Sequence, residues 1–126
     1  MDAPAVAVSA DGKKLAFGWM DMRTRSGERD VWWLLPGRPK EEALAEKNDG
    51  EQGNVSLAMD DEGTVYAAWH SATNVVVRTS KNPKNDVVST EASANFPSIA
   101  IRGDVKVVVY ECKKDGRDVV VCRAPF

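Results

Sequence analysis

One stretch of the chain decides the fold, and it reads Leu57-Ala58-Met59-Asp60-Asp61-Glu62-Gly63-Thr64-Val65-Tyr66-Ala67-Ala68-Trp69. A small apolar triplet comes first, a polar turn containing Gly63 follows, and a second apolar run closes on an aromatic residue. Short runs rich in Val, Ile, Trp and Tyr that are bounded by Gly and Asp are typical of strands, and Asp-Gly or Glu-Gly turns favour tight hairpins. The stretch therefore predicts a β-hairpin.

The same pattern occurs three times along the chain, with a period of roughly 40–50 residues, which is typical of propeller blades. The triplets are Val6-Ala7-Val8, Leu57-Ala58-Met59 and Ile99-Ala100-Ile101, preceded at the same offset by Pro4, Val55 and Pro97. The second runs are Leu15 to Trp19, Val65 to Trp69 and Val105 to Tyr110. The third runs are Val31 to Leu35, Val75 to Thr79 and Val119 to Arg123.

Residue type predicts where each strand lies in its blade. The triplets are small and apolar at every position, so we expect innermost strands with both faces covered. Outer strands are expected at residues 42–46 and 87–90, although the helix formers within residues 39–46 are also compatible with a short helical turn. The third repeat reaches Phe126 without room for an outer strand. The polar segment 47–54 is interpreted as a loop between blades.

The predicted fold class is therefore all-β, with three propeller-type blades of about four antiparallel strands each, or half a propeller. One strand is missing, so about eleven strands are expected. Residues 1–126 are predicted to form a single repeat domain, with blades at about 3–52, 53–94 and 95–126.

Composition narrows the function classes. Hydrophobic residues make up 43% of the chain and charged residues 29%, with a net charge of −2. Without a basic surplus, neither nucleic acid nor an anionic membrane is a predicted partner. Charged residues at 2, 11, 13 and 14 interrupt the first apolar stretch, so no signal peptide is predicted. Two interpretations of location stay open: an intracellular protein, or a secreted or periplasmic one whose leader has been removed.

Cofactor and metal motifs are not found in the sequence. It has no Gly-rich phosphate loop and no Cys-x-x-Cys, so neither a cofactor nor a metal is predicted. The single histidine, His70, is expected to be a hydrogen-bonded loop residue. Cys112 and Cys122 flank the turn at residues 114–117, which predicts adjacent antiparallel strands. Either a cross-strand disulfide forms in an oxidising compartment, or both are free, half-buried thiols.

Two segments resemble blades of the sialidase-like (BNR/Asp-box) β-propellers. The first runs from Pro4-Ala5-Val6-Ala7-Val8 through Asp11-Gly12 to Trp19-Met20-Asp21-Met22-Arg23, and the second from Leu57 through Gly63 and Trp69 to Val77-Arg78-Thr79-Ser80. In that family an Asp box, Ser-x-Asp-x-Gly-x-x-aromatic, follows the third strand. Here Ser80 to Val87 keeps the Ser, has Asn82 for the Asp and lacks both the Gly and the aromatic residue, so it is a degenerate box.

The resemblance implies a closed ring of six or seven blades, of which this chain supplies three. Isolated blades would leave apolar faces and sheet edges uncovered. We therefore expect either a homodimer, because twofold dimers are the commonest oligomers, or a chain that is part of a longer propeller.

The resemblance also implies where a ligand would bind. In such propellers, ligands meet the face formed by the loops between second and third strands and the loops that enter the innermost strands. The candidate ligand-binding residues there are Asp21, Arg23, Arg25, His70 and Glu111. A glycan or a protein is the expected ligand.

Two functions are compared on these residues. In a glycosidase, Asp21, Glu111 and Tyr110 would supply acid, base and nucleophile. However, an arginine cluster for a substrate carboxylate cannot be placed, and the spacing of Asp21 and Arg23 favours an ion pair that pins the loop. The main hypothesis is therefore a non-catalytic interaction or ligand-binding scaffold. The alternative is a sialidase-like glycan hydrolase whose site is completed by another chain or a missing segment.

Overall fold

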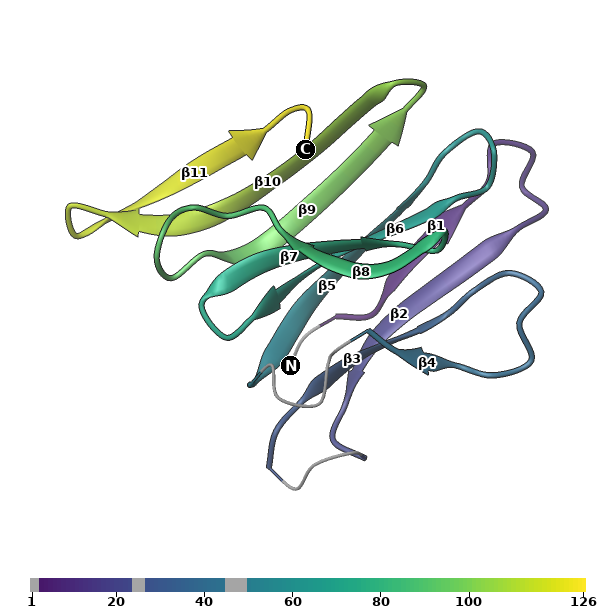
Figure 1. Ribbon diagram of the computed structural model, residues 1–126, viewed down its shortest axis with the longest axis horizontal. Helices are drawn as coiled ribbons and strands as arrows, with labels where there is room; N and C mark the ends of the chain where they lie inside the picture. The colour runs from purple at the N-terminus through teal and green to yellow at the C-terminus, as the bar shows by residue number, and fades with distance from the viewer. Residues whose placement is uncertain (1–2, 24–26, 45–49) are drawn as a thin grey trace.

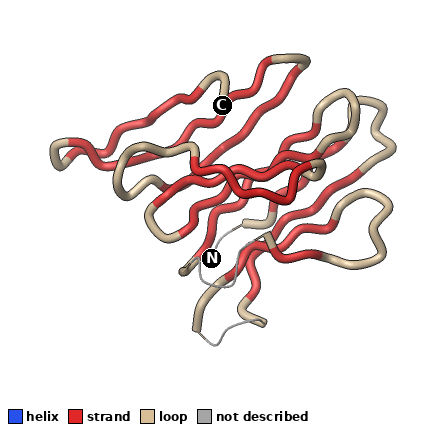
Figure 2. Tube along the Cα trace, viewed as in Figure 1, coloured by secondary structure: helices blue, strands red, loops and turns tan. Residues whose placement is uncertain are grey.

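The computed structural model describes residues 3–23, 27–44 and 50–126, and in those residues it shows strands and loops but no helix (Figures 1 and 2). Blade 1 is the sheet of β1 (Ala5–Val8), β2 (Leu15–Asp21), β3 (Asp30–Leu34) and β4 (Glu42–Ala43). Blade 2 is the sheet of β5 (Gln52–Met59), β6 (Val65–Ser71), β7 (Asn74–Thr79) and β8 (Asn82–Val87). Blade 3 is the sheet of β9 (Asn95–Arg102), β10 (Val105–Lys114) and β11 (Arg117–Arg123).

The predicted fold class is confirmed. Each blade is an antiparallel meander in which neighbours in sequence are neighbours in the sheet. The innermost strands β1, β5 and β9 lie next to one another, and the three sheets stack face against face (Figure 1). The expected hairpin turns are present as well: Gly12 and Gly63 have positive φ, and so do both Asp115 and Gly116, as a two-residue hairpin turn requires.

The outer strands correct the prediction in two places. The outer strand of blade 2 is β8, not residues 87–90, because only Ser80 and Lys81 separate it from β7. Most of the degenerate Asp box therefore lies in a strand. In blade 1, β4 covers Glu42–Ala43, without a helical turn in the described part of residues 39–46; residues 45 and 46 lie outside the described residues. Blade 3 has three strands, as expected.

The core consists of two inter-blade layers, because each strand sends alternate side chains to opposite faces. Between blades 1 and 2, the buried layer centres on Trp33 and Trp69. Between blades 2 and 3, it centres on Tyr66, Val108 and Tyr110. The first layer is so tight that a Cβ at Gly18 would lie 3.1 Å from the Cγ2 of Val55.

A repeated bulge shapes the innermost strands. The β5–β6 register shifts between Gly53 and Ser56, and the β9–β10 register shifts at the corresponding place. Asn54 and Phe96, at equivalent positions of the two bulges, both have positive φ, of 52° and 50°. Next to the bulge, the Ser56 hydroxyl accepts a hydrogen bond of 3.1 Å from the Ile99 backbone N–H. The innermost strands of blades 2 and 3 are thus joined directly.

The end blades correct the expectation that every innermost strand is covered on both faces. Val6 and Val8 of β1 are exposed on one face, and so are Ser98 and Ala100 of β9. The central strand β5 has neighbours on both sides, because blade 1 and blade 3 pack on its two faces. The uncovered faces belong to the two ends of the stack.

The cysteines lie on adjacent antiparallel strands, as predicted, but they do not form a disulfide. Cys112 is opposite Val119, and Cys122 is opposite Val109. Positions 109 and 112 are three apart in β10, an odd step along a strand, so the side chains of Cys112 and Cys122 point to opposite faces of blade 3. Both thiols are free, Cys112 being buried and Cys122 exposed.

This arrangement predicts unequal thiol reactivity. In the folded monomer, Cys122 should react with Ellman's reagent within seconds to minutes, whereas Cys112 should react only after unfolding. The measurement is thiol release before and after adding denaturant, with Cys122→Ser as the control that abolishes the fast phase. Two equally fast thiols would contradict the register.

Candidate functional site

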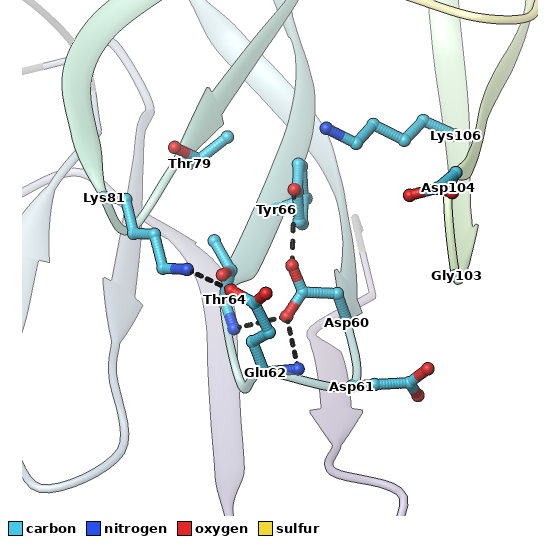
Figure 3. Close-up of a pocket in the computed structure, with 10 residues that line it drawn as sticks. All are labelled: Asp60, Asp61, Glu62, Thr64, Tyr66, Thr79, Lys81, Gly103, Asp104 and Lys106. Carbon is cyan, nitrogen blue, oxygen red and sulfur yellow. Dashed lines mark hydrogen bonds and ion pairs between the residues drawn. The ribbon is translucent and has the colours of Figure 1, made fainter.

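A polar pocket lies between blades 2 and 3, at the end of the stack where β5 turns into β6 (Figure 3). Blade 2 contributes this turn and the turn after β7, and blade 3 contributes Gly103, Asp104 and Lys106. The cavity volume is about 490 Å³, within the size range of small-ligand sites. The pocket exists only because the two blades pack together.

Asp60 is the fixed centre of this pocket. Its Oδ1 accepts hydrogen bonds from the backbone N–H groups of Glu62 and Thr64 at 3.0 and 2.8 Å, and the Tyr66 hydroxyl lies 3.4 Å from its Oδ2. Burial opposes ionisation of Asp60, but the hydrogen bonds outweigh it and lower the pKa of the carboxyl. Asp60 is therefore a preorganised carboxylate held by its own turn.

The other charged side chains of the pocket differ in whether they already have a partner within the protein. Lys81 pairs with Glu62 at 2.6 Å, and the Lys106 ammonium lies over the Tyr66 ring at 5.2 Å. Asp61 and Asp104 receive no hydrogen bond from the described residues. Figure 3 shows Asp104 and Lys106 on the blade 3 side, facing the Asp60 carboxylate and Tyr66 across the pocket. Four carboxylates therefore meet two ammonium groups, and the uncommitted acceptors can receive hydrogen bonds from a ligand.

A second, smaller pocket occupies the corresponding end of the junction between blades 1 and 2. Its volume is about 230 Å³, and Lys14, Arg38 and Ser80 contribute to its lining. This pocket has no carboxylate in its lining among the described residues. Both internal junctions are thus hollow at the same end, but among the described lining residues only those of the junction of blades 2 and 3 combine carboxylates with an aromatic ring.

The described residues of the predicted ligand-binding set, Asp21, Arg23, His70 and Glu111, lie at the opposite end of the blades. Arg23 binds Asp21 through its Nε at 2.7 Å and Glu41 at 2.5 Å, and its guanidinium lies 4.8 Å from the Trp32 ring centroid. Hydrogen bonds from Arg23 lower the pKa of Asp21. The structure thus contains the ion pair expected to pin this loop.

The other predicted residues do not join this cluster. His70 lies in strand β6 of blade 2 and not, as expected, in a loop, and its Nε2 is 3.0 Å from the Ala72 carbonyl oxygen. Glu111 is exposed in blade 3, and Arg25 lies outside the described residues. Tyr110 is buried toward blade 2, whereas Glu111, the next residue of the same strand, points to the other face. The tyrosine and glutamate of the glycosidase hypothesis are therefore separated by the sheet.

Tyr110 instead belongs to an ionic cluster that joins the blade 2–blade 3 loop to blade 3. Its hydroxyl donates to Glu91 at 2.6 Å, and Arg123 contacts the other oxygen of Glu91 at 2.5 Å and the Thr90 hydroxyl at 2.7 Å. The hydrogen bond from Tyr110 lowers the pKa of Glu91 to about 2, against the effect of burial. Burial, followed by the Glu91 carboxylate, raises the pKa of Tyr110, which makes its oxygen a poorer nucleophile.

Neither a metal centre nor a membrane-spanning helix is found in the described part of the chain. No group of three or more His, Cys, Asp or Glu residues there could hold a metal ion. No helix in the same residues is long and apolar enough to cross a membrane.

The sequence offered only a weak signal for the pocket between blades 2 and 3. Asp60, Asp61 and Glu62 form an acidic run in a turn, which is most simply a solvated hairpin. Lys106 and Asp104 lie about forty residues further along the repeat, and only the packing of two blades brings them opposite that turn. Glu91 was likewise missed, because a loop carboxylate has no periodicity.

Comparison with known proteins bears on the fold. No family model matches the chain, and no curated protein does. Among solved structures, the chain is similar to a fucose lectin from Kordia zhangzhouensis in complex with methyl-fucoside, with a TM-score of 0.59 and 11% identity. The similarity covers 96% of this chain and 92% of the lectin chain. At this identity it supports the β-propeller-like fold alone.

The Glu91 cluster predicts a pH-dependent contribution to stability. Because the pKa of Glu91 is lowered from 4.5 to about 2, its contribution is complete above pH 5 and is lost as the pH falls toward 2. We expect Glu91→Gln to reduce the free energy of unfolding by about 1–2 kcal/mol at pH 7 and by much less at pH 2.5.

Urea unfolding of the unaltered protein and of Glu91→Gln, at one fixed protein concentration and at both pH values, measures this difference. Glu111→Gln is the matched control, because Glu111 is an exposed carboxylate next to Tyr110 in the same strand. A Glu91→Gln effect of equal size at pH 7 and pH 2.5 would contradict the charged cluster.

Proposed function

We propose that this chain is a non-catalytic carbohydrate-binding scaffold of the β-propeller type, and that the pocket between blades 2 and 3 holds the glycan. One observation carries the proposal: the chain shares its fold, over nearly the whole of both chains, with a lectin whose structure contains methyl-fucoside. The pocket adds chemistry that suits a sugar, since it combines carboxylates, ammonium groups and hydroxyls in one cavity.

The charges of the pocket favour a neutral sugar over an acidic one. Asp104 and Asp61 can accept hydrogen bonds from sugar hydroxyls, and hydrogen bonds to an ionised acceptor are the stronger kind. Lys106 can donate to a ring oxygen or a hydroxyl. A sialic acid carboxylate would meet four carboxylates against two ammonium groups, which is unfavourable. The proposed ligand class is therefore a neutral monosaccharide or a glycan that ends in one.

Three features argue against the alternative, a sialidase-like glycan hydrolase. Tyr110 is buried and hydrogen-bonded, and its pKa is raised. Glu111 points to the other face of the sheet. Asp21 is engaged by Arg23 in blade 1. These residues do not converge on one substrate position, as acid, base and nucleophile must.

Ring closure is part of the same proposal. The scaffold acts within a closed ring of blades, completed by a second copy or by further blades of a longer chain. The carbohydrate pocket itself lies inside one chain, because both of its walls come from blades 2 and 3.

Calorimetry with methyl-fucoside and a panel of other neutral glycosides tests the proposed pocket. We expect saturable binding of at least one glycoside, and a loss of about tenfold or more in affinity for Asp104→Ala, because a hydrogen bond to a charged group is worth about 1.5–3 kcal/mol. Asp115→Asn is the matched control: it removes one carboxylate from the opposite end of blade 3 and tolerates the positive φ of that turn.

Two results would contradict the proposal. One is the absence of binding by every glycoside tested, with the protein folded by circular dichroism. The other is turnover of fluorogenic glycosides that is lost in Asp21→Ala or Glu111→Ala, which would favour the hydrolase.

A further inference from the structure

The three blades present the same two kinds of face in the same order. We call the face that meets the preceding blade the leading face and the face that meets the next blade the trailing face. In blade 2 the leading face includes Leu57 and Ala67, which are paired across β5 and β6, and in blade 3 it includes Ile99 and Val108, which are paired across β9 and β10. All four residues are buried at the two internal junctions.

The leading face of blade 1 has the same pattern but no neighbour. Val6 and Phe17 are paired across β1 and β2, in the position that Ile99 and Val108 occupy in blade 3. Ala67 and Val108 are 0% exposed, whereas Phe17 is 43% and Val6 is 56% exposed. Further apolar side chains extend this face: Val8, Leu15, Trp19, Trp32 and Leu34. Contiguous apolar surface of this kind marks an interaction site.

The trailing face of blade 3 also has no neighbouring blade, and it is the kind of face on which a leading face packs inside the chain. The innermost strand carries small side chains on its trailing face, as at Ala7 in blade 1, which pairs with Ala16, and at Ala58 in blade 2, which pairs with Tyr66. The corresponding pair in blade 3 is Ala100 and Val107, and Ala100 is exposed. Val120 is 73% exposed on the same face, where blade 2 has the fully buried Val75.

A polar group on the trailing face of blade 3 repeats one that is used inside the chain. Ser56 on the trailing face of blade 2 accepts the hydrogen bond from the Ile99 N–H of the next blade. By register, Ser98 is the equivalent of Ser56, and Val6 is the equivalent of Ile99. Ser98 is exposed. The next blade would therefore place its Val6 N–H on the Ser98 hydroxyl.

We propose that the leading face of blade 1 docks on the trailing face of blade 3 of a second copy of this chain, and that two copies close one ring through two identical junctions. The occupant is a second copy because each open face matches the surface that the chain itself buries against the other kind of face. The inference rests on the propeller-type scaffold of the proposed function and is independent of its glycan.

Light scattering coupled to size exclusion measures the assembly. We expect a mass of twice 13.8 kDa for the unaltered chain. Phe17→Asp and Ala100→Asp, which place a charge in the leading and trailing face, should each give a mass of 13.8 kDa. Val87→Asp is the control that should stay dimeric, because Val87 is also an exposed apolar residue, at 62%, but lies on the outer strand β8. Circular dichroism checks that every variant is folded.

Mixing the two monomeric variants distinguishes contact between a leading and a trailing face from contact between two faces of the same kind. The Phe17→Asp chain keeps its trailing face and the Ala100→Asp chain keeps its leading face, so one unaltered junction forms and the dimer mass returns in part. A monomeric unaltered chain at all concentrations, a mass above two copies, or a mixture that stays monomeric would each overturn the proposal.

A glycan-binding measurement distinguishes failure of the docking proposal from failure of the proposed carbohydrate-binding function. The pocket between blades 2 and 3 lies within one chain, so monomeric Phe17→Asp should bind the same glycosides as the dimer. Loss of glycan binding in a protein that still forms the dimer would count against the carbohydrate site and leave the docking intact.

Discussion

The structure depends on one constraint: a blade has apolar side chains on both faces, so it needs a neighbour on each side. Strand geometry imposes this, since alternate residues point to opposite faces and both sets of positions in β6 are buried. Blade 2 satisfies the constraint completely, with Trp69 packed toward blade 1 and Tyr66 toward blade 3. Blades 1 and 3 satisfy it on one face only. The exposed apolar residues follow from that position and are concentrated on the two outward faces.

The same packing creates the candidate site, and hydrogen bonds hold both ends of the junction that forms it. At one end of the blade 2–blade 3 junction, Glu91 joins Tyr110 and Arg123. At the other end, the turn after β5 is fixed by hydrogen bonds to Asp60, while Asp104 stands uncommitted on the facing blade. A site held on a rigid frame loses less entropy when a ligand binds. The Glu91 cluster thus holds blades 2 and 3 together at one end of the junction, and the pocket at the other end keeps polar groups available for a ligand.

Much of the fold could be predicted from the sequence, because triplets such as Leu57-Ala58-Met59 and turns such as Glu62-Gly63 are local signals. The Cys112–Cys122 register was also within reach, since a two-residue turn at Asp115 and Gly116 fixes which residues face each other. The pocket was not, because Asp60 and Lys106 come from different repeats and meet only through blade packing. Outer strand β8 was misplaced because its sequence, Asn-Pro-Lys-Asn-Asp-Val, is almost entirely polar and carries no strand period.

Strand alternation also bears on the alternative hypothesis of a glycan hydrolase. Tyr110 and Glu111, the nucleophile and base of that hypothesis, are adjacent residues of one strand, and adjacent residues of a strand point to opposite faces. The partner that Tyr110 does find, Glu91, lies nineteen positions away in a loop. Its carboxylate accepts the hydroxyl proton in a hydrogen bond and, together with burial, raises the pKa of Tyr110. A tyrosine that donates its hydroxyl hydrogen bond to Glu91 stabilises the junction of blades 2 and 3. This structural role is consistent with a binding scaffold.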